Sequence, residues 1–436
     1  MEYETLQALL PLKDKGVMRL GLETIDQLMA LFDHPENKLP TIHVAGTNGK
    51  GSTCKMLATI LQEAGYSVGL YTSPSIMTFN DRMLVDGVEV SDEELLWAAQ
   101  EIREAVAGTD LVFTEFEMYT AMAWLIFAKR DVDLIVLEVG MGGRIDATNL
   151  VKQPLVSVIM KIAMDHEDIL GHTLAEIAGE KAEIIKAHRP VVAYPGQDET
   201  VFPVFEEKAA ACEAPLIYPD FDALSYDLDV APKQTFTYRG ETYTLNFLEE
   251  HQIWNATVAL EVIAQLQKQG YDISQAAVKE GLATVTWPAR FEWIHTKPDI
   301  IIDGSHNLDG ITGLKDSLLR YFKDKRRIGI MGLLADKDTE HIVAEIAPVF
   351  DTIITVRSDS DRAWSAEDLR EQIVRYSQKS YGTITEASTY QEALDLALQA
   401  EQNSAEDSMI TIFGSFYYVG LMRELIIKQL KGGRSE

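Results

Sequence analysis

A glycine-rich loop is the first part of the chain whose residues could do chemistry. It is the stretch 46–53 within TIHVAGTNGKGST (41–53). Small residues let the backbone approach a phosphate closely, and the N–H groups at the start of a following helix favour an anion. Lys50 can reach the β- and γ-phosphates of a nucleotide, and Ser52 or Thr53 can ligate Mg²⁺. We therefore predict an ATP-binding loop made of Gly46, Thr47, Asn48, Gly49, Lys50, Gly51, Ser52 and Thr53.

The loop departs from the usual P-loop spelling. Val44 stands where the first glycine of that motif belongs, and Gly51 separates Lys50 from Ser52. The alternative is a tight turn between a strand and a helix that carries an incidental lysine. Three glycines, one lysine and the hydroxyls of Ser52 and Thr53 within eight residues favour phosphate binding over that alternative.

Glu138 is a second candidate, at the end of the apolar run DLIVLEVG (133–140). A buried carboxylate is costly unless it is paired or bound to a metal. At the carboxyl end of a strand it could ligate Mg²⁺. It could equally be satisfied by backbone N–H groups of the glycine-rich loop behind it. The residues alone leave both readings open.

Other candidates have ordinary explanations when each is taken alone. Ser73 before Pro74 is common loop chemistry. His166 directly after Asp165 is more often a structural histidine than a ligand, and Lys181 is typical of a solvated helix face. A turn or a helix cap would explain the later segments PARFE and DGSHN.

Strands and helices that alternate along the first half must position these residues. Strands are predicted in IHVAG, VGLYT, DLIVLEVG, PLVSVIM and PVVAYP, at 42–46, 68–72, 133–140, 154–160 and 190–195. Helices are predicted over 55–65, 115–130 and 173–188. This alternation indicates an α/β domain with a parallel sheet that is covered on both faces.

The middle of the chain changes character. KQTFTYRGETYTLNF (233–247) predicts a hairpin around Arg239-Gly240, and hence a small antiparallel piece. The stretch 253–270 returns to a helical pattern that stops at Gly270.

Alternation restarts after a segment without helical period that Pro288 and Pro298 bracket. Strands are then predicted in DIIIDG, RRIGIMGLL, DTIITV, GTITE and MITIFGS. We expect a domain boundary in this segment, with an ATP-binding domain over 1–292 and a second α/β domain over 293–436.

Composition narrows the class of protein. The 436 residues carry 68 acidic and 39 basic side chains, a net charge of −29, which argues against nucleic acid as a partner. The two cysteines form no disulfide framework. The N-terminus lacks the pattern of a signal peptide, and no apolar run reaches the length of a membrane span. We expect a cytoplasmic protein without a membrane partner.

The spelling of the loop, with Asn48 and Gly51, resembles that of the folylpolyglutamate synthase/dihydrofolate synthase family within the Mur-ligase superfamily. The resemblance continues in YTSPSIMTFNDR (71–82) and VLEVGMGGRIDATN (136–149). It extends through Asp165-His166 and Lys181 into HQIWNATVAL, PARFE and DGSHN, and covers the chain from about Gly21 to Gly420.

The resemblance implies a role for each matching residue. The Mg²⁺ ligands would be Ser52, Ser73, Glu138 and His166. The folate site would include Pro74, Phe79, Asn80 and Arg82. The nucleotide would be contacted by the loop and by Asn255, Arg290, Asp303 and His306. The catalytic residues would be Lys50, Lys181, His166 and Arg290, with Lys181 carbamylated so that it supports a second Mg²⁺.

The implied fold is a P-loop ATPase domain followed by a Rossmann-like α/β domain. In the implied reaction a substrate carboxylate attacks the γ-phosphate of ATP, and the amino group of L-glutamate then attacks the acyl phosphate. The expected activity is folylpolyglutamate synthase, which adds L-glutamate to the γ-carboxylate of a reduced folate and releases ADP and phosphate. The alternative is a bifunctional enzyme that also acts on dihydropteroate. A monomer is expected.

Some positions depart from the family's pattern. Ser75 stands where many members carry histidine, which favours tail extension alone. Glu183 stands where the family usually has glycine, and Ser305 and Leu308 are milder departures.

Two rival functions remain. Another Mur-type ligase would usually carry an N-terminal domain for a UDP-sugar, and only about forty residues precede the loop. An ATP-dependent switch would need the loop but has no use for DGSHN or for an arginine at the hinge.

Overall fold

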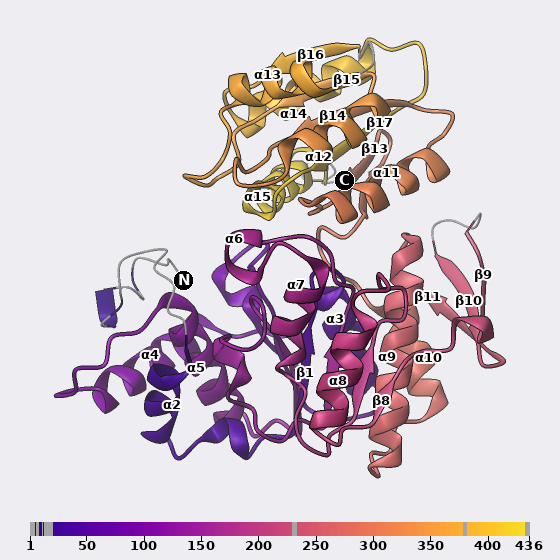
Figure 1. Cartoon of the computed structure of the whole chain (residues 1–436). Helices are drawn as coiled ribbons and strands as arrows, with labels where there is room; N and C mark the ends of the chain where they lie inside the picture. Colours follow the sequence, from indigo (N-terminus) through magenta and orange to yellow (C-terminus); the bar gives the residue numbers. More distant parts are fainter. Residues whose placement is uncertain are drawn as a thin grey trace. The chain divides into compact units, whose positions relative to one another are not determined.

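The computed structural model describes residues 5, 8–10, 12, 21–228, 233–377 and 382–431. The chain forms two compact units, which are coloured along the sequence in Figure 1. The first unit is Met1–Tyr226 with Thr235–Asn246 and Gln252–Val285. The second is Asp227–Gln234, Phe247–His251 and Thr286–Glu436. The predicted domains, 1–292 and 293–436, stay a prediction.

The first unit contains an eight-stranded sheet in the order β4-β3-β2-β5-β1-β6-β7-β8. The strands are β1 Thr41–Ala45, β2 Val68–Tyr71, β3 Met83–Val85, β4 Val88–Glu89, β5 Leu134–Glu138, β6 Val156–Ile159, β7 Val191–Ala193 and β8 Leu216–Ile217. β1 pairs in parallel with β5 and β6 at the centre, and β3 and β4 add an antiparallel edge. The predicted parallel sheet is confirmed, whereas the edge hairpin was not predicted because its strands are too short to show alternation.

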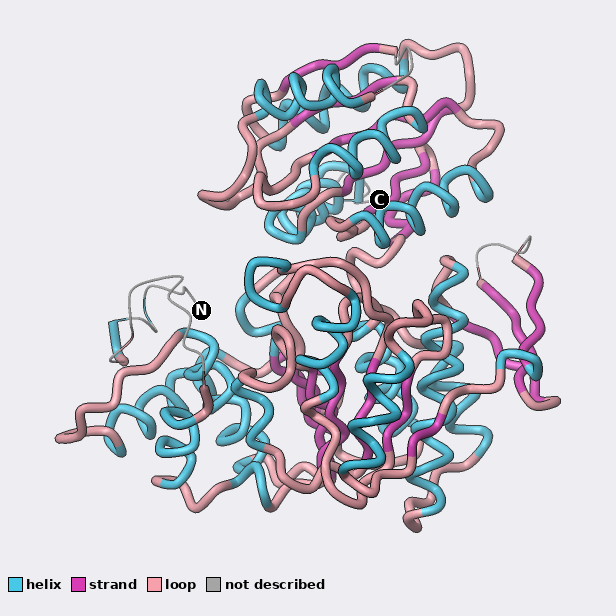
Figure 2. The backbone as a smooth tube through the Cα atoms, viewed as in Figure 1, coloured by secondary structure: helices cyan, strands magenta, loops and turns pink. Residues whose placement is uncertain are grey.

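Helices cover both faces of this sheet, as Figure 2 shows. They are α2 Glu23–Ala30, α3 Lys50–Glu63, α4 Asp92–Ala105, α5 Glu115–Lys129, α6 Glu167–Leu170, α7 Leu174–Ala182, α8 Phe202–Ala211, α9 Glu250–Lys268 and α10 Gln275–Thr284. Ser91 and Thr114 start α4 and α5 as capping boxes with Glu94 and Glu117. No helix within the described residues combines the length and apolar character of a membrane crossing.

Two predicted helices have different ends in the structure. The helix predicted over 55–65 begins at Lys50, because Gly49 adopts a positive φ of 86° and lets the helix start directly on the loop. The helix predicted over 173–188 ends at Ala182. The chain leaves the helix there, and Ile184 is then buried with its carbonyl accepting a hydrogen bond from Ser157 of β6.

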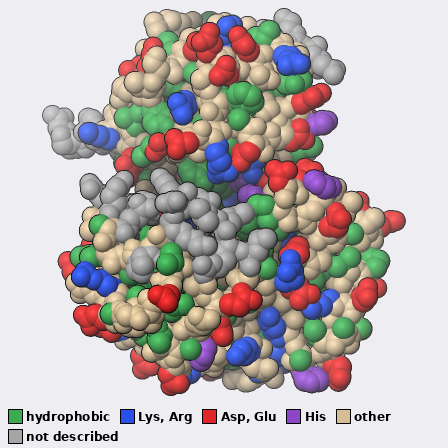
Figure 3. Space-filling view, turned by 60° about the vertical axis from the view of Figure 1, so that its left-hand side comes forward, with side chains coloured by type: hydrophobic (Ala, Val, Ile, Leu, Met, Phe, Trp, Pro, Cys, Tyr) green, Lys and Arg blue, Asp and Glu red, His purple; other side chains and the backbone are tan. Residues whose placement is uncertain are grey.

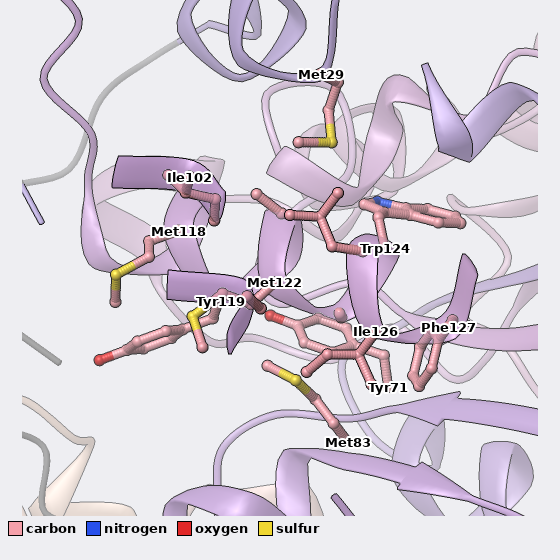
Figure 4. Close-up of a cluster of buried hydrophobic side chains, with 14 of the residues drawn as sticks. Met29, Tyr71, Met83, Ile102, Met118, Tyr119, Met122, Trp124, Ile126 and Phe127 are labelled. Atoms are coloured by element: carbon pink, nitrogen blue, oxygen red, sulfur yellow. The ribbon is translucent and has the colours of Figure 1, made fainter. Parts of the chain in front are cut away.

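One core of the first unit is built around α5, which is buried on nearly all sides. Trp124, Ile126 and Phe127 of this helix pack with side chains of α2, α4, β2 and β3 in the cluster that Figure 4 shows. Ile135 and Leu137 of β5 belong to the same cluster. This packing fixes the strands whose carboxyl ends carry Ser73 and Glu138.

A three-stranded sheet in the order β11-β10-β9 follows. Its strands are β9 Leu224–Asp227, β10 Gln234–Tyr238 and β11 Glu241–Leu245. Arg239 and Gly240 have φ values of 50° and 82°, as the two-residue turn of a hairpin requires. The predicted hairpin is confirmed, and β9 is an additional strand.

The second unit contains a six-stranded sheet in the order β12-β13-β17-β14-β15-β16. The strands are β12 Glu292–Thr296, β13 Asp299–Ile302, β14 Arg326–Met331, β15 Thr352–Thr355, β16 Thr383–Glu386 and β17 Ser408–Phe413. All neighbours pair in parallel except β12 with β13. The helices are α11 Leu308–Tyr321, α12 Thr339–Ile346, α13 Ala366–Tyr376, α14 Tyr390–Gln402 and α15 Phe416–Ile426. The predicted Rossmann-like α/β architecture is confirmed.

Acidic side chains are spread over the surface of both units. On the face in Figure 3 they alternate with lysine and arginine side chains.

Tyr418 of α15 joins the ends of β14 and β17. Its buried hydroxyl lies 2.9 Å from the Ile330 carbonyl, also contacts the Phe413 carbonyl, and accepts a hydrogen bond of 3.1 Å from the Gly332 N–H. A Cβ on Gly332 would lie 2.9 Å from the Tyr418 ring. This hydroxyl therefore fixes the starts of the loops that leave both strands.

We predict that Tyr418→Phe lowers the free energy of unfolding by about 1–3 kcal/mol, because it removes the buried hydrogen bonds between this hydroxyl and the backbone. Urea unfolding of the purified variant measures the change. Tyr417→Phe is the matched control, since the neighbouring ring is half-exposed. An equal effect of the two substitutions would show that the buried hydroxyl makes no net contribution.

Candidate functional site

The loop between β1 and α3 needs its glycines. Gly46 and Gly49 have φ values of 146° and 86°. A Cβ on Gly46 would lie 2.6 Å from the Cβ of Met160, so the loop passes directly over the end of β6. The N–H groups of Lys50, Gly51 and Ser52 precede the first intrahelical hydrogen bond of α3, as an anion site requires.

The first half of the loop is fastened to the segment that follows β6. The N–H groups of Thr47 and Asn48 donate to the Lys161 carbonyl over 2.8 and 3.2 Å. The Thr47 hydroxyl donates to the Ala163 carbonyl and accepts from the Ala163 N–H, both at 3.1 Å. These two residues therefore shape the loop, and the helix start provides the donors for phosphate.

Lys50 and Glu138 come together at the carboxyl edge of the sheet. The Lys50 Nζ lies 3.9 Å from Glu138 Oε1 and donates to the Thr47 carbonyl over 3.2 Å. The other oxygen of Glu138 accepts a 3.2 Å hydrogen bond from the Ser73 N–H. The glutamate is only 3% exposed. A lysine and a loop N–H therefore accompany this buried carboxylate, and its role as a Mg²⁺ ligand stays a prediction.

The residues around Glu138 fit Mg²⁺. The hydroxyls of Ser52 and Ser73 and the carboxylate are hard oxygen donors, which this ion prefers. The Thr53 hydroxyl is buried without a partner among the described residues. The described part of the chain holds no group of three or more His, Cys, Asp or Glu side chains able to cage a metal. Mg²⁺ commonly binds through one or two carboxylates together with substrate phosphates and water, and this donor set suits that mode.

His166 begins the short helix α6 in a left-handed conformation, with a φ of 53°. Its N–H donates to Asp165 over 3.0 Å, and its ring Nε2 lies 3.9 Å from the same carboxylate. The side chain is 44% exposed. The structure thus places the histidine in a loop beside an acid, and its proposed role as a metal ligand stays a prediction.

Lys181 is not the solvated lysine that the sequence alone would suggest. It is 4% exposed on α7, and its Nζ donates to the Gly46 carbonyl over 2.9 Å. Burial, and to a smaller extent the charge of Lys50, lower the pKa of Lys181 to about 7 against the opposing effect of Asp165 and Asp146. A Cβ on Gly143 would lie 2.6 Å from the backbone of this helix. The lysine therefore reaches the phosphate loop with an amine that can lose its proton near neutral pH.

A buried network behind the site was not foreseen. Thr148 donates to Asp146 and lies 2.9 Å from the Nε2 of His43 in β1. Asp146 also accepts a 2.8 Å hydrogen bond from the Met141 N–H, and burial raises the pKa of its carboxyl group. Burial lowers the pKa of His43 to about 3, so this ring is neutral. The network shapes the loop behind Glu138. Its only signal in the sequence is a histidine inside an apolar strand.

Asn255 of α9 packs directly on the phosphate loop. A Cβ on Gly49 would lie 2.7 Å from the Asn255 Oδ1, and the asparagine is 2% exposed. Its Nδ2 donates to Gln252 over 3.2 Å. The asparagine and the loop are therefore positioned as one group.

The residues predicted for folate form a separate group after β2. The rings of Phe79 and Tyr119 are 4.6 Å apart, and the Arg82 guanidinium lies 5.3 Å from the Tyr119 ring. The Nε of Arg82 is buried and has no partner in the part of the chain that is described. Asn80 instead holds the end of β4, since it donates to the Val90 carbonyl over 2.7 Å. Tyr119 lies in the helix predicted over 115–130 and was not among the predicted site residues.

In the second unit Asp303 is buried and supports the backbone. One of its oxygens accepts a 2.9 Å hydrogen bond from Phe291 and the other a 2.8 Å hydrogen bond from Ser305. His306 contacts the Gly304 carbonyl over 2.9 Å through Nδ1. Asp303 therefore shapes the segments on either side of it. Contact with a ribose would be an additional role, which stays a prediction.

Arg290 lies against an aromatic ring that was also missed. Its guanidinium carbon is 4.5 Å from the centre of the Phe416 ring. Phe416 was not among the candidate residues predicted from the sequence. Two residues that lie far apart in the sequence give no signal of such a contact.

Glu183 has a clear place in the structure. Its φ is −67°, so the position does not require the glycine that is usual in the resembling family. Its carboxylate accepts a 2.7 Å hydrogen bond from Lys208 of α8. Glu183 therefore adds a contact between the end of α7 and α8, and its backbone conformation is unstrained.

Two family models match the chain. The Mur ligase middle domain matches residues 44–263, and the Mur ligase glutamate ligase domain matches residues 289–416. The first match contains the phosphate loop, Glu138, Lys181 and Asn255. The second contains Arg290 and the segment around Asp303.

Relatives of similar length match over nearly the whole chain. A dihydrofolate synthase/folylpolyglutamate synthase of Bacillus subtilis is 34% identical over 93% of this chain and 94% of the relative. A folylpolyglutamate synthase of Lacticaseibacillus casei is 34% identical over 94% of each chain. A crystal structure of Mycobacterium tuberculosis folylpolyglutamate synthase complexed with ADP and AMPPCP aligns with a TM-score of 0.85 and 31% identity, over 93% of this chain and 95% of that one. The chain belongs to the Mur ligases, within the family of folylpolyglutamate and dihydrofolate synthases, and is an ATP-dependent acid–amino-acid ligase of that family.

Proposed function

We propose that this protein is a folylpolyglutamate synthase that adds L-glutamate to the γ-carboxylate of a reduced folate and converts ATP to ADP and phosphate. The observation that carries the proposal is the convergence of Lys50, Glu138 and Lys181 at one edge of the sheet. The phosphate loop alone would be compatible with any nucleotide-binding protein. A buried lysine and a buried carboxylate beside it suit the transfer of a phosphoryl group to a carboxylate.

The residues of the loop would bind and orient ATP. The N–H groups at the start of α3 and the Lys50 ammonium would hold the β- and γ-phosphates, and Asn255 would contact the adenine. Ser52, Ser73, Glu138 and His166 would hold Mg²⁺. The ion would offset the charge of the phosphates when bound. Arg290 and His306 of the second unit would contact the nucleotide, which orients the γ-phosphate towards the folate carboxylate.

Lys181 is proposed to be carbamylated. Its neutral Nζ would attack the carbon of CO₂, forming an N–C bond while one C=O electron pair moves to oxygen and a proton leaves the nitrogen. A pKa of about 7 supplies the neutral amine at physiological pH. The product is an anion that would replace a cation beside Lys50 and provide oxygen donors for a second Mg²⁺.

The cluster of Phe79, Arg82 and Tyr119 is proposed to bind the folate. Its aromatic faces suit a planar pterin ring, and its arginine suits a carboxylate. The buried Arg82 Nε, which lacks a partner among residues that the structure describes, is a donor suited to such an acceptor. The cytoplasmic location and the monomeric state remain predictions.

A bifunctional enzyme is the second candidate, because the Bacillus subtilis relative carries both names. Ser75 favours tail extension alone. Dihydropteroate has a carboxylate but no glutamate tail, so the two activities differ in the length of the substrate that enters.

The function is tested by glutamate-dependent release of ADP from ATP and Mg²⁺, with tetrahydrofolate in one arm and dihydropteroate in the other. We expect turnover with tetrahydrofolate and none without glutamate. Turnover in both arms would establish the bifunctional enzyme. ATP binding without glutamate-dependent turnover in either arm would refute the proposal and indicate a nucleotide switch.

We predict that Gly49→Ala raises the KM for ATP about tenfold or more, because the new Cβ displaces Asn255 and strains the loop. Steady-state kinetics with varied ATP measures the effect. Gly65→Ala is a matched control with a φ of 91° and no atom within 4 Å of the new Cβ. Gly65→Ala should lower the free energy of unfolding by about 1 kcal/mol, because alanine is disfavoured in this left-handed backbone conformation, as it is at Gly49. If both variants keep the KM of the original protein, the close packing on the loop has no part in ATP binding.

We predict that Lys181→Met lowers turnover by about two orders of magnitude or more. The original protein should lose activity in bicarbonate-free buffer and gain activity as the pH rises through about 7, where Lys181 loses its proton. Isotope-labelled bicarbonate should give a carbamate signal by NMR that Lys181→Met lacks. Lys186→Met is the control and should keep both. Full activity without bicarbonate, together with no carbamate signal, would exclude the modification.

A further inference from the structure

We propose that helix α15 positions Arg290 for the nucleotide through two of its side chains, Phe416 and Arg423. This inference rests on the proposed function of Arg290 as a nucleotide ligand. Neither Phe416 nor Arg423 would touch the substrate itself. Each would act by holding the arginine or the turn that carries it.

Phe416 holds the side chain of Arg290. Its ring lies 4.5 Å from the guanidinium carbon on one side and 5.4 Å from the centre of the His306 ring on another. A Cβ on Gly304 would lie 2.0 Å from an atom of this ring, so the ring occupies the space that a side chain would take. The ring is 7% exposed. One buried ring thus contacts Arg290 and His306, two of the three nucleotide ligands predicted in the second unit.

Arg423 holds the turn on which Arg290 sits. Its guanidinium forms a bidentate pair with Glu292, with contacts of 2.7 and 2.9 Å. Glu292 in turn accepts a 3.1 Å hydrogen bond from the Ala289 N–H. Phe291, on the other side of the arginine, donates to Asp303. Two carboxylates therefore fix the N–H groups on both sides of Arg290.

The backbone at this turn needs such support. Ala289 and Phe291 have φ values of 55° and 42°, a left-handed conformation that non-glycine residues seldom adopt. Strained conformations of this kind persist only where the surrounding contacts hold them. The side chain shows the same constraint, since the Arg290 Nε is buried with no partner in the described part of the chain. Stacking on the ring leaves the terminal nitrogens of the guanidinium as its remaining donors.

If Phe416 only packed in the core and did not position Arg290, its substitution would have a different kinetic effect. Loss of simple packing lowers stability and adds to the effect of any other substitution. Loss of the positioning proposed for Arg290 acts through that arginine, so it has no further effect once the arginine is removed. A double-mutant cycle separates the two cases.

The test compares Phe416→Leu, Arg290→Ala and the double variant in the full-length protein. The measurements are kcat, the KM for ATP, and the Kd for ADP with Mg²⁺ by calorimetry. We expect Phe416→Leu to lower kcat/KM for ATP about tenfold, as loss of a cation–π contact implies. The double variant should be no worse than Arg290→Ala, and Phe416→Tyr, which keeps the ring face, should retain activity. Losses that multiply in the double variant would overturn the inference.

Two further variants complete the design. Tyr417→Leu is the matched control. The Tyr417 ring lies 5.8 Å from the guanidinium of Arg362, so its removal should leave kcat/KM for ATP unchanged. Arg423→Lys keeps the charge but not the bidentate pair, and its loss should also disappear in the Arg290→Ala background. If the wild-type protein shows no folate turnover, the proposed function fails. The double-mutant cycle measured on the Kd for ADP then still tests whether Phe416 positions Arg290. If Arg290→Ala changes neither turnover nor ADP affinity, the inference is overturned.

Discussion

The hydrogen bond from Lys181 to the Gly46 carbonyl is the contact on which the arrangement of the site depends. It ties α7 to the turn that ends β1 and starts the phosphate loop. It also brings a second amine close to Lys50, and two ammonium groups in a buried space repel each other. The site accommodates both because one amine can lose its proton near neutral pH and because Glu138 lies beside the other. The contact that positions α7 on the loop therefore also requires that the charges of Lys50, Lys181 and Glu138 balance at this edge of the sheet.

Much of the fold, and the candidate residues of the site in the first unit, could be predicted because their sequence signals are local. Apolar runs, glycines and caps lie close together in sequence, so the loop, Glu138 and the two α/β architectures could be inferred from short stretches. Tyr119, His43 and Phe416 could not be inferred, since each acts through a contact between segments far apart in the chain. An aromatic residue at helical spacing indicates a core, and nothing nearby reveals that an arginine lies on its face.

Carboxylates illustrate the same limit. Asp303 and Glu292 carry the residue type expected of ligands, yet each accepts hydrogen bonds from backbone N–H groups beside Arg290. Glu138, the last residue of β5 in the first unit, also accepts a backbone N–H, and its other oxygen lies 3.9 Å from the Lys50 Nζ at the phosphate loop. Sequence identifies an acid at the end of a strand, but the side chains that meet it there decide whether it supports the backbone or faces a ligand.

The bonds that fasten Thr47 and Asn48 to Lys161 have a consequence for binding. They join protein atoms alone, so the first half of the loop is already ordered before a nucleotide arrives. The conformational entropy of that half is lost when the protein folds and does not oppose association. A preorganised loop of this kind can accept ATP and release ADP without refolding in each cycle, which leaves other segments to set the pace of turnover.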